Sequence, residues 1–152
     1  MSIKTRKASF AEVAAEVVAC NPDARGTYGD ALTVETLMNN VEVDPEDDSR
    51  VLGNLRWSRI GIVVLPERIG DLTVDGILNL SDNQLESLPE SFGSLTVRGD
   101  LYLQGNKLES LPESFGSLTA GGYLYLNKNQ LESLNEHSFP GLHLIVGESD
   151  DY

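Results

Sequence analysis

The sequence predicts an α/β solenoid, a stack of coils with a parallel β-sheet on one face and short helices capping its N-terminal end. Two near-copies support this prediction, because residues 78–99 read LNLSDNQLESLPESFGSLTVRG and residues 101–122 read LYLQGNKLESLPESFGSLTAGG. The offset of 23 residues continues from Leu124 (LYLNKNQLESL) and, more loosely, runs back to Leu55. A fixed period in this range is typical of proteins built from stacked coils.

Residues 1–50 are predicted to form an N-terminal helical cap followed by an acidic linker. Ser9 and Glu12 have the spacing of a capping box, and apolar residues recur at helical spacing over residues 10–20. A second short helix is predicted over residues 33–40, with Thr33 as its N-cap. We expect these helices to shield the first coil from solvent, with an independent partner-binding helix as the alternative.

The segment VEVDPEDDSR, residues 41–50, carries a run of acidic side chains. Residues 8–50 contain ten acidic and two basic side chains, a net charge of −8 ahead of the repeats. We interpret the segment as a solvated linker, with a docking strip for a basic partner as the alternative. A calcium loop is disfavoured, because the alternating acids and central glycine of an EF-hand are missing.

Each coil is predicted to run through one strand and to return along the far side. Apolar residues alternate at period two, which places them on the inward face of parallel strands stacked one coil apart. Pro89 and Pro112 favour an extended return segment over an α-helix. The predicted inward set is Val74, Gly76, Leu78 and Leu80, then Val97, Gly99, Leu101 and Leu103, then Ala120, Gly122, Leu124 and Leu126, with Phe92, Phe115 and Phe139 filling the far side.

Asn83, Asn106 and Asn129 recur just after the predicted strands. A buried asparagine at such a bend can bond backbone groups of its own turn and of the neighbouring coil, which the bend removes from the sheet. We therefore assign these three residues a structural role as a ladder between coils rather than a catalytic one.

The first and last coils depart from the repeat. Trp57 stands where later coils have leucine, so it is predicted to pack toward the N-terminal helices. Ile60 stands where later coils have the ladder asparagine, so the first coil is expected to lack that turn bond. Residues 142–146 are predicted to begin a last strand, and the acidic tail at residues 147–152 is expected to discourage end-to-end pairing.

The repeated residues resemble the leucine-rich repeat family, whose pattern Leu-x-x-Leu-x-Leu-x-x-Asn-x-Leu is matched from its second leucine onward. The resemblance covers residues 51–146 as about four coils, the first and last degenerate, and LPESFGSL is similar to short proline-containing repeats of bacterial and large-virus proteins. It implies a solenoid whose parallel sheet lines the concave face. In place of the family's first strand leucine this chain has a Val/Ala-x-Gly lead-in, which is expected to lengthen the strand.

The resemblance also implies a non-enzymatic protein-protein interaction module that binds a partner protein through outward strand positions on the concave face. Tyr102 and Tyr125 are expected to stack, with Tyr123 on the same face, as binding residues or alternatively as sheet packing. Two alternative functions are considered for the chain: a structural component of a larger assembly such as a virion, and a substrate-receptor subunit of an enzyme complex. The expected partner-binding residues are Tyr102, Tyr123, Tyr125, Arg98, Asp100, Asn79, Gln104 and Asn127, with Ser81 among the other outward positions.

The chain of 152 residues has a formal net charge of −13, which argues against nucleic acid and anionic membranes as ligands and favours a basic partner. Its single cysteine, Cys20, excludes an internal disulfide and is typical of an intracellular, cytoplasmic protein, or of host cytoplasm or a virion if the source is viral. Glu12 and Glu16 interrupt the apolar N-terminal segment, so a signal peptide is rejected, and no apolar run is long enough to span a bilayer. The oligomeric state is left open.

Nothing in the sequence indicates catalytic residues, a cofactor or a metal site. His137 and His143 lie in the irregular last coil without metal-ligand spacing, and the recurrent glycines belong to the repeat rather than to a phosphate-binding loop. Cys20 has no nearby histidine in the sequence, so it is expected to be a small buried residue rather than a nucleophile.

Overall fold

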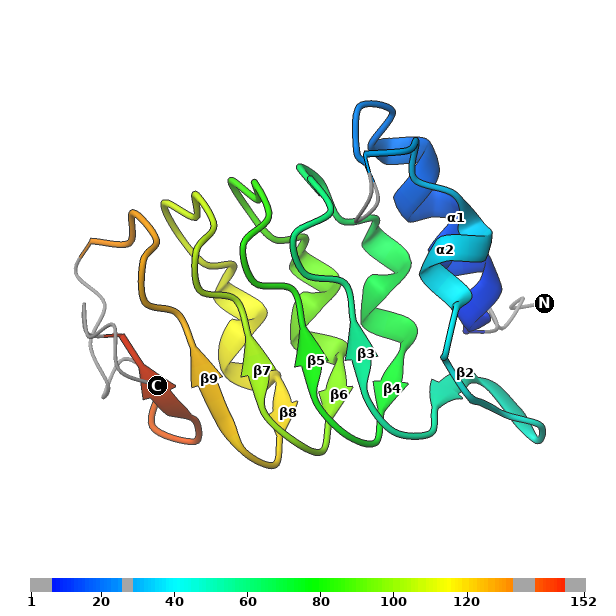
Figure 1. Ribbon diagram of the computed structural model, residues 1–152. Helices are drawn as coiled ribbons and strands as arrows, with labels where there is room; N and C mark the ends of the chain where they lie inside the picture. The colour runs from blue at the N-terminus through cyan, green and yellow to red at the C-terminus, as the bar shows by residue number, and fades with distance from the viewer. Residues whose placement is uncertain (1–6, 26–28, 133–138, 147–152) are drawn as a thin grey trace, which may run out of the picture.

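The computed structural model describes residues 7–25, 29–132 and 139–146. In this part of the chain the coils stack side by side, with one set of strands in front, 3₁₀ helices behind and two α-helices at the N-terminal end (Figure 1). The strands form two five-stranded sheets within the described residues, ordered β10-β9-β7-β5-β3 and β1-β2-β4-β6-β8. This arrangement confirms the predicted α/β solenoid.

The first sheet lines the concave face, by which we mean its surface on the side away from the 3₁₀ helices. Leucines one repeat apart share a register across this sheet and are buried, so that each strand turns its other side chains outward. Neighbouring strands all pair in parallel. The strands are β3 (Leu55–Arg56), β5 (Leu78–Asn79), β7 (Leu101–Tyr102), β9 (Tyr123–Tyr125) and β10 (His143–Ile145).

Each full coil contains two short strands, where the sequence predicts one longer strand. A bend at Gly76, Gly99 or Gly122 separates the two, because successive coils approach closely there and bond glycine to glycine through the backbone. A Cβ atom on Gly99 would lie 2.8 Å from the backbone of Gly76, so a larger residue does not fit. The prediction that these glycines occupy inward strand positions is therefore wrong. The second sheet consists of β1 (Val43–Asp44), β2 (Asp47–Val51), β4 (Thr73–Val74), β6 (Thr96–Val97) and β8 (Thr119–Ala120).

Three 3₁₀ helices form the return side of the described coils: η1 (Glu67–Asp71), η2 (Glu90–Ser94) and η3 (Glu113–Ser117). Pro89 and Pro112 precede η2 and η3 with extended backbone. Proline is tolerated at the start of a helix, because the first N–H groups have no partner within the helix. The prediction of an extended return segment is thus wrong beyond each proline, where the chain turns into a short helix.

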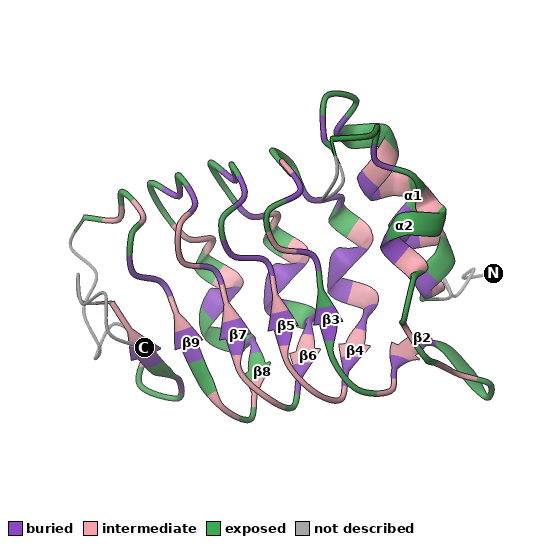
Figure 2. Cartoon of the chain, viewed as in Figure 1, coloured by how far each residue is buried: buried purple, intermediate pink, exposed green. Residues whose placement is uncertain are grey.

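Columns of buried leucine and phenylalanine fill the space between the sheets and the 3₁₀ helices. Figure 2 shows buried segments on the strands and the helices of successive coils. Phe92 and Phe115 are fully buried, and their nearly parallel rings have centroids 6.1 Å apart. Phe139 packs against Phe115 at 5.3 Å. Burying a side chain of this kind stabilises the fold by about 1.5–3 kcal/mol, so these columns are a strong link between successive coils.

Two α-helices, α1 (Phe10–Cys20) and α2 (Val34–Met38), cover the first coil. The predicted helix over residues 10–20 is confirmed together with its capping box, in which Ser9 and Glu12 bond each other's backbone N–H groups. Trp57 packs on the cap as predicted: its ring lies 5.6 Å from that of Phe10, and its Nε1 donates to the carbonyl of Leu37 at 3.0 Å.

Asn21, the C-cap of α1, fastens the cap to the first coil through a buried side chain. Its Oδ1 accepts hydrogen bonds from the N–H groups of Val63 and Val64 at 2.7 and 3.0 Å, and its Nδ2 donates to Val64 O at 2.8 Å. In the sequence, Asn21 is simply the residue that follows the helical pattern of residues 10–20. Its second role depends on a loop 42 residues away in the chain, which no local pattern indicates.

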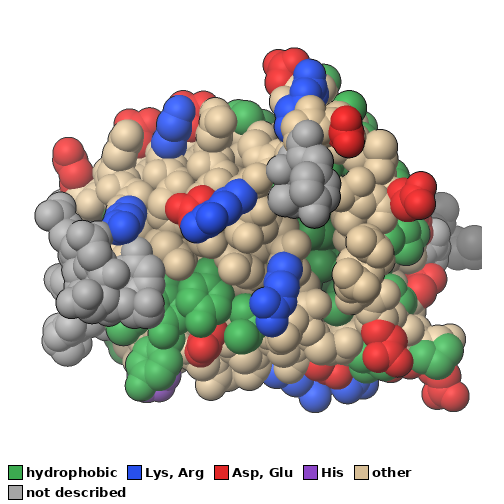
Figure 3. Space-filling model, in the orientation of Figure 1, with side chains coloured by type: hydrophobic (Ala, Val, Ile, Leu, Met, Phe, Trp, Pro, Cys, Tyr) green, Lys and Arg blue, Asp and Glu red, His purple; other side chains and the backbone are tan. Residues whose placement is uncertain are grey.

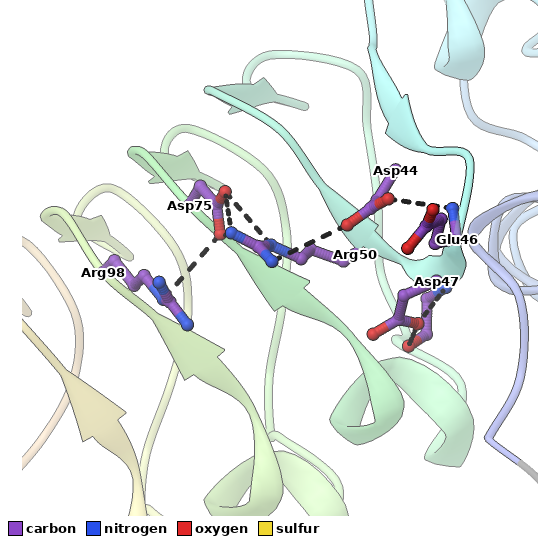
Figure 4. Close-up of polar contacts among 7 residues, drawn as sticks. Asp44, Glu46, Asp47, Arg50, Asp75 and Arg98 are labelled. Atoms are coloured by element: carbon purple, nitrogen blue, oxygen red, sulfur yellow. Dashed lines mark hydrogen bonds and ion pairs between the residues drawn. The ribbon is translucent and has the colours of Figure 1, made fainter.

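The acidic segment predicted as a linker instead forms a β-hairpin, β1 and β2, that extends the second sheet. Ser49 and Val51 turn inward while Glu46, in the hairpin turn, and Asp47 and Asp48, at the start of β2, are exposed to solvent, an arrangement suited to a sheet edge. Arg50 donates hydrogen bonds of 2.9 to 3.1 Å to Asp75, which fasten the hairpin to the next coil (Figure 4). The bonds from Arg50 hold the pKa of the Asp75 carboxyl below its usual range.

Cys20 is exposed at the end of α1, so the prediction that it is buried is wrong. The helix turns this position away from the core face formed by Phe10, Val13 and Val17. The predicted last strand is confirmed as β10, which pairs in parallel with β9. His137 and the predicted acidic tail at residues 147–152 lie outside the described residues.

Candidate functional site

Tyr102 and Tyr125 form a stacked pair in the middle of the concave face. Leu101 and Leu124 on the same strands point into the core, so the alternation of the strands turns both tyrosines outward. The two rings lie in parallel register with centroids 4.6 Å apart and an interplanar angle of 6°. The predicted stacking is confirmed. Partial burial raises the pKa of the Tyr102 hydroxyl, and the nearby Asp100 carboxylate raises it further.

Tyr123 and His143 extend this pair into an aromatic cluster. The Tyr123 side chain is 52% exposed, and its ring lies 6.5 Å from that of Tyr125 and 5.9 Å from that of His143. His143 belongs to this surface although the repeat pattern does not predict it. The 23-residue period predicts that Val146 lies beside Tyr123 on the next strand. The last coil is shorter, so the register of β10 places His143 there instead.

Asp100 is engaged with the next coil rather than free to contact a ligand. Its Oδ1 accepts a hydrogen bond from the N–H of Tyr123 at 2.8 Å, which fixes the start of β9. Asn54 does the same for Ile77 at 2.7 Å, two coils earlier in the same column. The Asp100 carboxylate therefore positions the aromatic cluster and contributes one negative charge to its edge.

The polar positions beyond the tyrosines are less accessible than predicted. Asn79 is half-buried, and its Oδ1 accepts bonds from the backbone N–H and the hydroxyl of Ser81. Ser81 and Asn127 are buried, with Asn127 only 1% exposed, because the chain bends inward toward the ladder asparagines after each strand. The prediction that Asn127 is an outward contact residue is therefore corrected. Gln104 is partly exposed, although its Oε1 is buried without a hydrogen-bond partner among the described residues.

Arg98 lies apart from the aromatic cluster, at the end of β6 in the second sheet. Its guanidinium faces Asp75 at 3.8 Å and continues the row formed by Asp44, Arg50 and Asp75 (Figure 4). The predicted placement of Arg98 on the same strand as Tyr102 is wrong, because the chain bends at Gly99 between β6 and β7.

Asn83, Asn106 and Asn129 form hydrogen bonds between successive coils. Asn106 Nδ2 donates to the carbonyls of Leu80 and Leu103 at 3.1 and 3.0 Å, while its Oδ1 accepts from the N–H of Leu85 at 3.1 Å. Asn83 and Asn129 make the same kinds of bond to their own and the preceding coil. These bonds satisfy backbone groups at the bend and hold the outward strand positions at a constant spacing.

Two hollows lined by described residues open on the concave face, and one of them reaches Tyr102. The cap hollow, of about 560 Å³, lies between α2 and β3, and the central hollow, of about 620 Å³, lies along the ends of β5 and β7. Ser58 lines both, so the two hollows adjoin. The cap hollow is lined by Leu37, Asn39, Asn40, Asn54, Arg56 and Trp57 among others, and the central hollow by Arg59, Asn79, Asp82, Tyr102, Gln104 and Lys128 among others.

Figure 3 shows a hydrophobic patch over β7 and β9 and Lys and Arg side chains across the rest of this face. The described residues contain no group of three or more His, Cys, Asp and Glu side chains arranged to hold a metal ion. Among the helices of the described chain, none has the length and apolar character needed to cross a membrane. The concave face thus combines exposed aromatic rings with adjoining hollows lined by polar and charged side chains.

Comparison with known proteins identifies the repeat itself. Residues 77–95 and 100–118 each match the family model described as Leucine Rich Repeat. A search of curated proteins found no match to the chain. The two matched segments are consecutive coils, each running from its concave-face strand through its 3₁₀ helix. The repeat matches and the parallel register of the coils together show that the chain contains leucine-rich repeats.

Proposed function

We propose that the chain binds a partner protein through its concave face, with Tyr102, Tyr123 and Tyr125 at the centre of the contact. Leucine-rich repeats are generally protein-interaction modules and are typically non-enzymatic. The observation that carries the proposal is the exposed aromatic cluster, in which two tyrosines are stacked and a third is 52% exposed.

The cluster is suited to binding because its side chains are already ordered. Tyrosine has few rotatable bonds, and the stacking of Tyr102 on Tyr125 restricts them further, so little conformational entropy is lost on contact. The three rings present apolar faces together with hydroxyl groups that can bond a partner's backbone. Interface hot spots are enriched in such residues.

The adjoining hollows favour a protruding loop or an extended segment as the contacting part of the partner. The central hollow begins at Tyr102 and runs past Asn79 and Gln104, whose side chains are partly exposed. A flat partner surface would leave this space unfilled, whereas a loop inserted beside Tyr102 would contact the ring and the hollow together. Asn79 and Gln104 then supply polar contacts at the edge of the aromatic cluster.

A capture experiment from the native source tests the proposal with three forms of the chain. These are the wild type, a concave variant with Tyr102→Ala, Tyr123→Ala and Tyr125→Ala, and a return-side variant with Ser94→Ala, Glu113→Ala and Ser117→Ala. All three changed residues of the return-side variant are exposed on or beside the 3₁₀ helices. Melting curves first establish that all three forms fold, and mass spectrometry then quantifies the captured proteins.

We expect at least one protein to be recovered equally by the wild type and the return-side variant. Its recovery by the concave variant should fall at least about tenfold, because each aromatic hot spot contributes about 2 kcal/mol or more. Equal recovery of every protein by the three forms would show that the tyrosines serve only to pack the sheet.

A further inference from the structure

We propose that the partner segment bound by the concave face is acidic, and that one of its carboxylates binds Arg56 at the mouth of the cap hollow. This inference rests on the proposed function and specifies the chemistry of its partner. It is drawn from the charged side chains of the described residues that line the two hollows, which are mostly positive although the whole chain is negative.

Arg56 is an exposed cation on β3, and the structure shows no ion pair between it and another described residue. Among the described residues that line the cap hollow, Arg56 is the only charged one. Other described arginines are engaged: Arg50 and Arg98 with Asp75, and Arg59 with Asp82. Arg56 therefore keeps its guanidinium donors available for a carboxylate, the group that they bind best.

The rest of the cap hollow suits a carboxylate and the backbone that carries it. Asn39, Asn40 and Asn54 line it with amide groups, while Leu37 and Trp57 form an apolar wall. The side-chain oxygen of Asn54 accepts a hydrogen bond from the N–H of Ile77, so the amide N–H₂ group of Asn54 is not used in that bond. None of the described residues that line this hollow is acidic, so none of them would repel an incoming carboxylate.

The charges lining the two hollows together are mostly positive. Among the described residues of the two linings, Arg56, Arg59 and Lys128 contribute positive charges, and Asp82 contributes the one negative charge. The chain as a whole carries a net charge of −13. A basic partner, which the overall charge favours, would thus meet repulsion at these hollows, while an acidic segment would be attracted to this face and repelled from most others.

Strand register places Arg56 on the same line as the aromatic pair. Arg56 pairs with Asn79, Asn79 with Tyr102, and Tyr102 with Tyr125, so these side chains form one row across the sheet. Two strand spacings, about 9–10 Å, separate Arg56 from Tyr102. An extended peptide advances about 3.3 Å per residue, so one segment can place an acidic residue at Arg56 and an apolar one at Tyr102, two to four positions apart.

Selection of peptides tests this directly, with a phage-displayed library of random dodecapeptides as the probe. Enriched peptides are synthesised with a fluorophore, and their Kd is measured by anisotropy against the full chain. The variants are Arg56→Glu, the triple tyrosine variant and, as a matched control, Arg98→Glu. Arg98 is also an exposed arginine, but it belongs to the row beside Asp75.

We expect enriched peptides to carry Asp or Glu two to four positions from an aromatic or aliphatic residue. Arg56→Glu should weaken their binding at least about tenfold, whereas Arg98→Glu should change it less than about twofold. Replacing the peptide's acidic residue by lysine should restore binding to Arg56→Glu, because the charges are then complementary again.

The other outcomes separate the two proposals. Peptides that need the tyrosines but carry no acidic residue, or that bind Arg56→Glu as well as the wild type, would overturn the acidic partner and leave the concave-face function standing. Peptides unaffected by the tyrosine variant, or no enrichment over an unrelated protein, would overturn both. If the chain bound a nucleic-acid control selectively, or associated with itself through Arg56, the ligand of this face would not be an acidic peptide. Either result would overturn this inference.

Discussion

Between the two most similar coils, the sequence of the return side is conserved more than the sequence of the concave face. Residues 85–96 and 108–119, which run from the ladder turn through the 3₁₀ helix, are identical. The concave segments 78–84 and 101–107 keep their leucines and their asparagine but differ elsewhere. The differences are Asn79 against Tyr102, Ser81 against Gln104, Asp82 against Gly105 and Gln84 against Lys107.

The contacts explain this division. On the return side the two coils contact each other directly: Phe92 stacks on its copy Phe115, and the Ser114 hydroxyl donates to the carbonyl of Glu90. A change there disturbs two coils at once. The outward concave positions project from the sheet and constrain the neighbouring coil less, so they can differ without loss of the fold. The comparison therefore separates residues that hold the coils together from residues that are free to carry binding.

The largest effect is expected from Phe92→Ala on the return side. Phe92 is fully buried and stacked on Phe115, so its truncation removes buried apolar surface and leaves a cavity between two coils. The free energy of unfolding should fall by about 3–5 kcal/mol, measured by urea denaturation. Ser94→Ala, an exposed neighbour, should stay within about 0.5 kcal/mol of the wild type. Similar values for the two variants would refute the role given to the phenylalanine column.

A smaller effect is expected from Gly93→Ala, for which the next coil supplies a matched control. A Cβ at Gly93 would lie 2.1 Å from the carbonyl oxygen of Ser114, whereas one at Gly116 would lie 3.2 Å from a ring carbon of Phe139. Gly93→Ala should therefore cost about 1–3 kcal/mol from overpacking, and Gly116→Ala clearly less. The comparison of the two melting curves is sharp because the surrounding sequence is the same. Equal losses would mean that the clash between coils is not what excludes a side chain.

A modest loss of stability with a large loss of binding is expected on the concave face. The double substitution Tyr102→Asn and Gln104→Ser gives this coil the residues found at the same positions of the preceding one. Stability should fall by about 0.5–1.5 kcal/mol from the lost stacking on Tyr125. Binding of a captured partner, measured by calorimetry, should fall at least about tenfold. Unchanged affinity would place the binding surface elsewhere.

The smallest effect concerns the row of charges at the hairpin. Because hydrogen bonds from Arg50 lower the pKa of Asp75 in the folded state, this interaction stabilises the fold above the ordinary aspartate pKa, about 3.9. The contribution is lost as the pH falls through the folded-state pKa. Asp75→Asn should therefore melt earlier than the wild type at neutral pH and lose less stability on acidification. Parallel pH profiles for the two proteins would contradict this assignment.

Much of the solenoid could be predicted because its determinants recur. The leucines, the ladder asparagines and the phenylalanine column each repeat with the coil, and the capping box of α1 is local in sequence. The double strand could not be predicted from the alternation alone. Val74, Gly76 and Leu78 fit a single strand by period, and only the close approach of Gly76 to its neighbours in the adjacent coils reveals the bend.

The candidate site was only partly predictable for a related reason. The stacking of Tyr102 on Tyr125 follows from the repeat, since both keep its register. His143 and Arg56 do not follow in the same way. The shortened last coil shifts the register of His143, and the importance of Arg56 depends on a hollow made by α2, a distant part of the chain. The net charge of the chain likewise does not reveal the positive side chains of the hollows. It adds up charges from every face of the molecule, whereas a partner contacts one face.

Site-specific photocrosslinking tests whether a partner binds through the concave face. Benzoylphenylalanine is placed at position 102 on the concave face or at position 94 on the return side, and each protein is irradiated with a partner captured by the wild type. Tyr102 is half-buried in the aromatic cluster, while Ser94 is exposed on η2. If the partner binds through the concave face, we expect a covalent product from position 102 and none above background from position 94. A product from position 94 alone, or equal products from both, would contradict binding through the concave face.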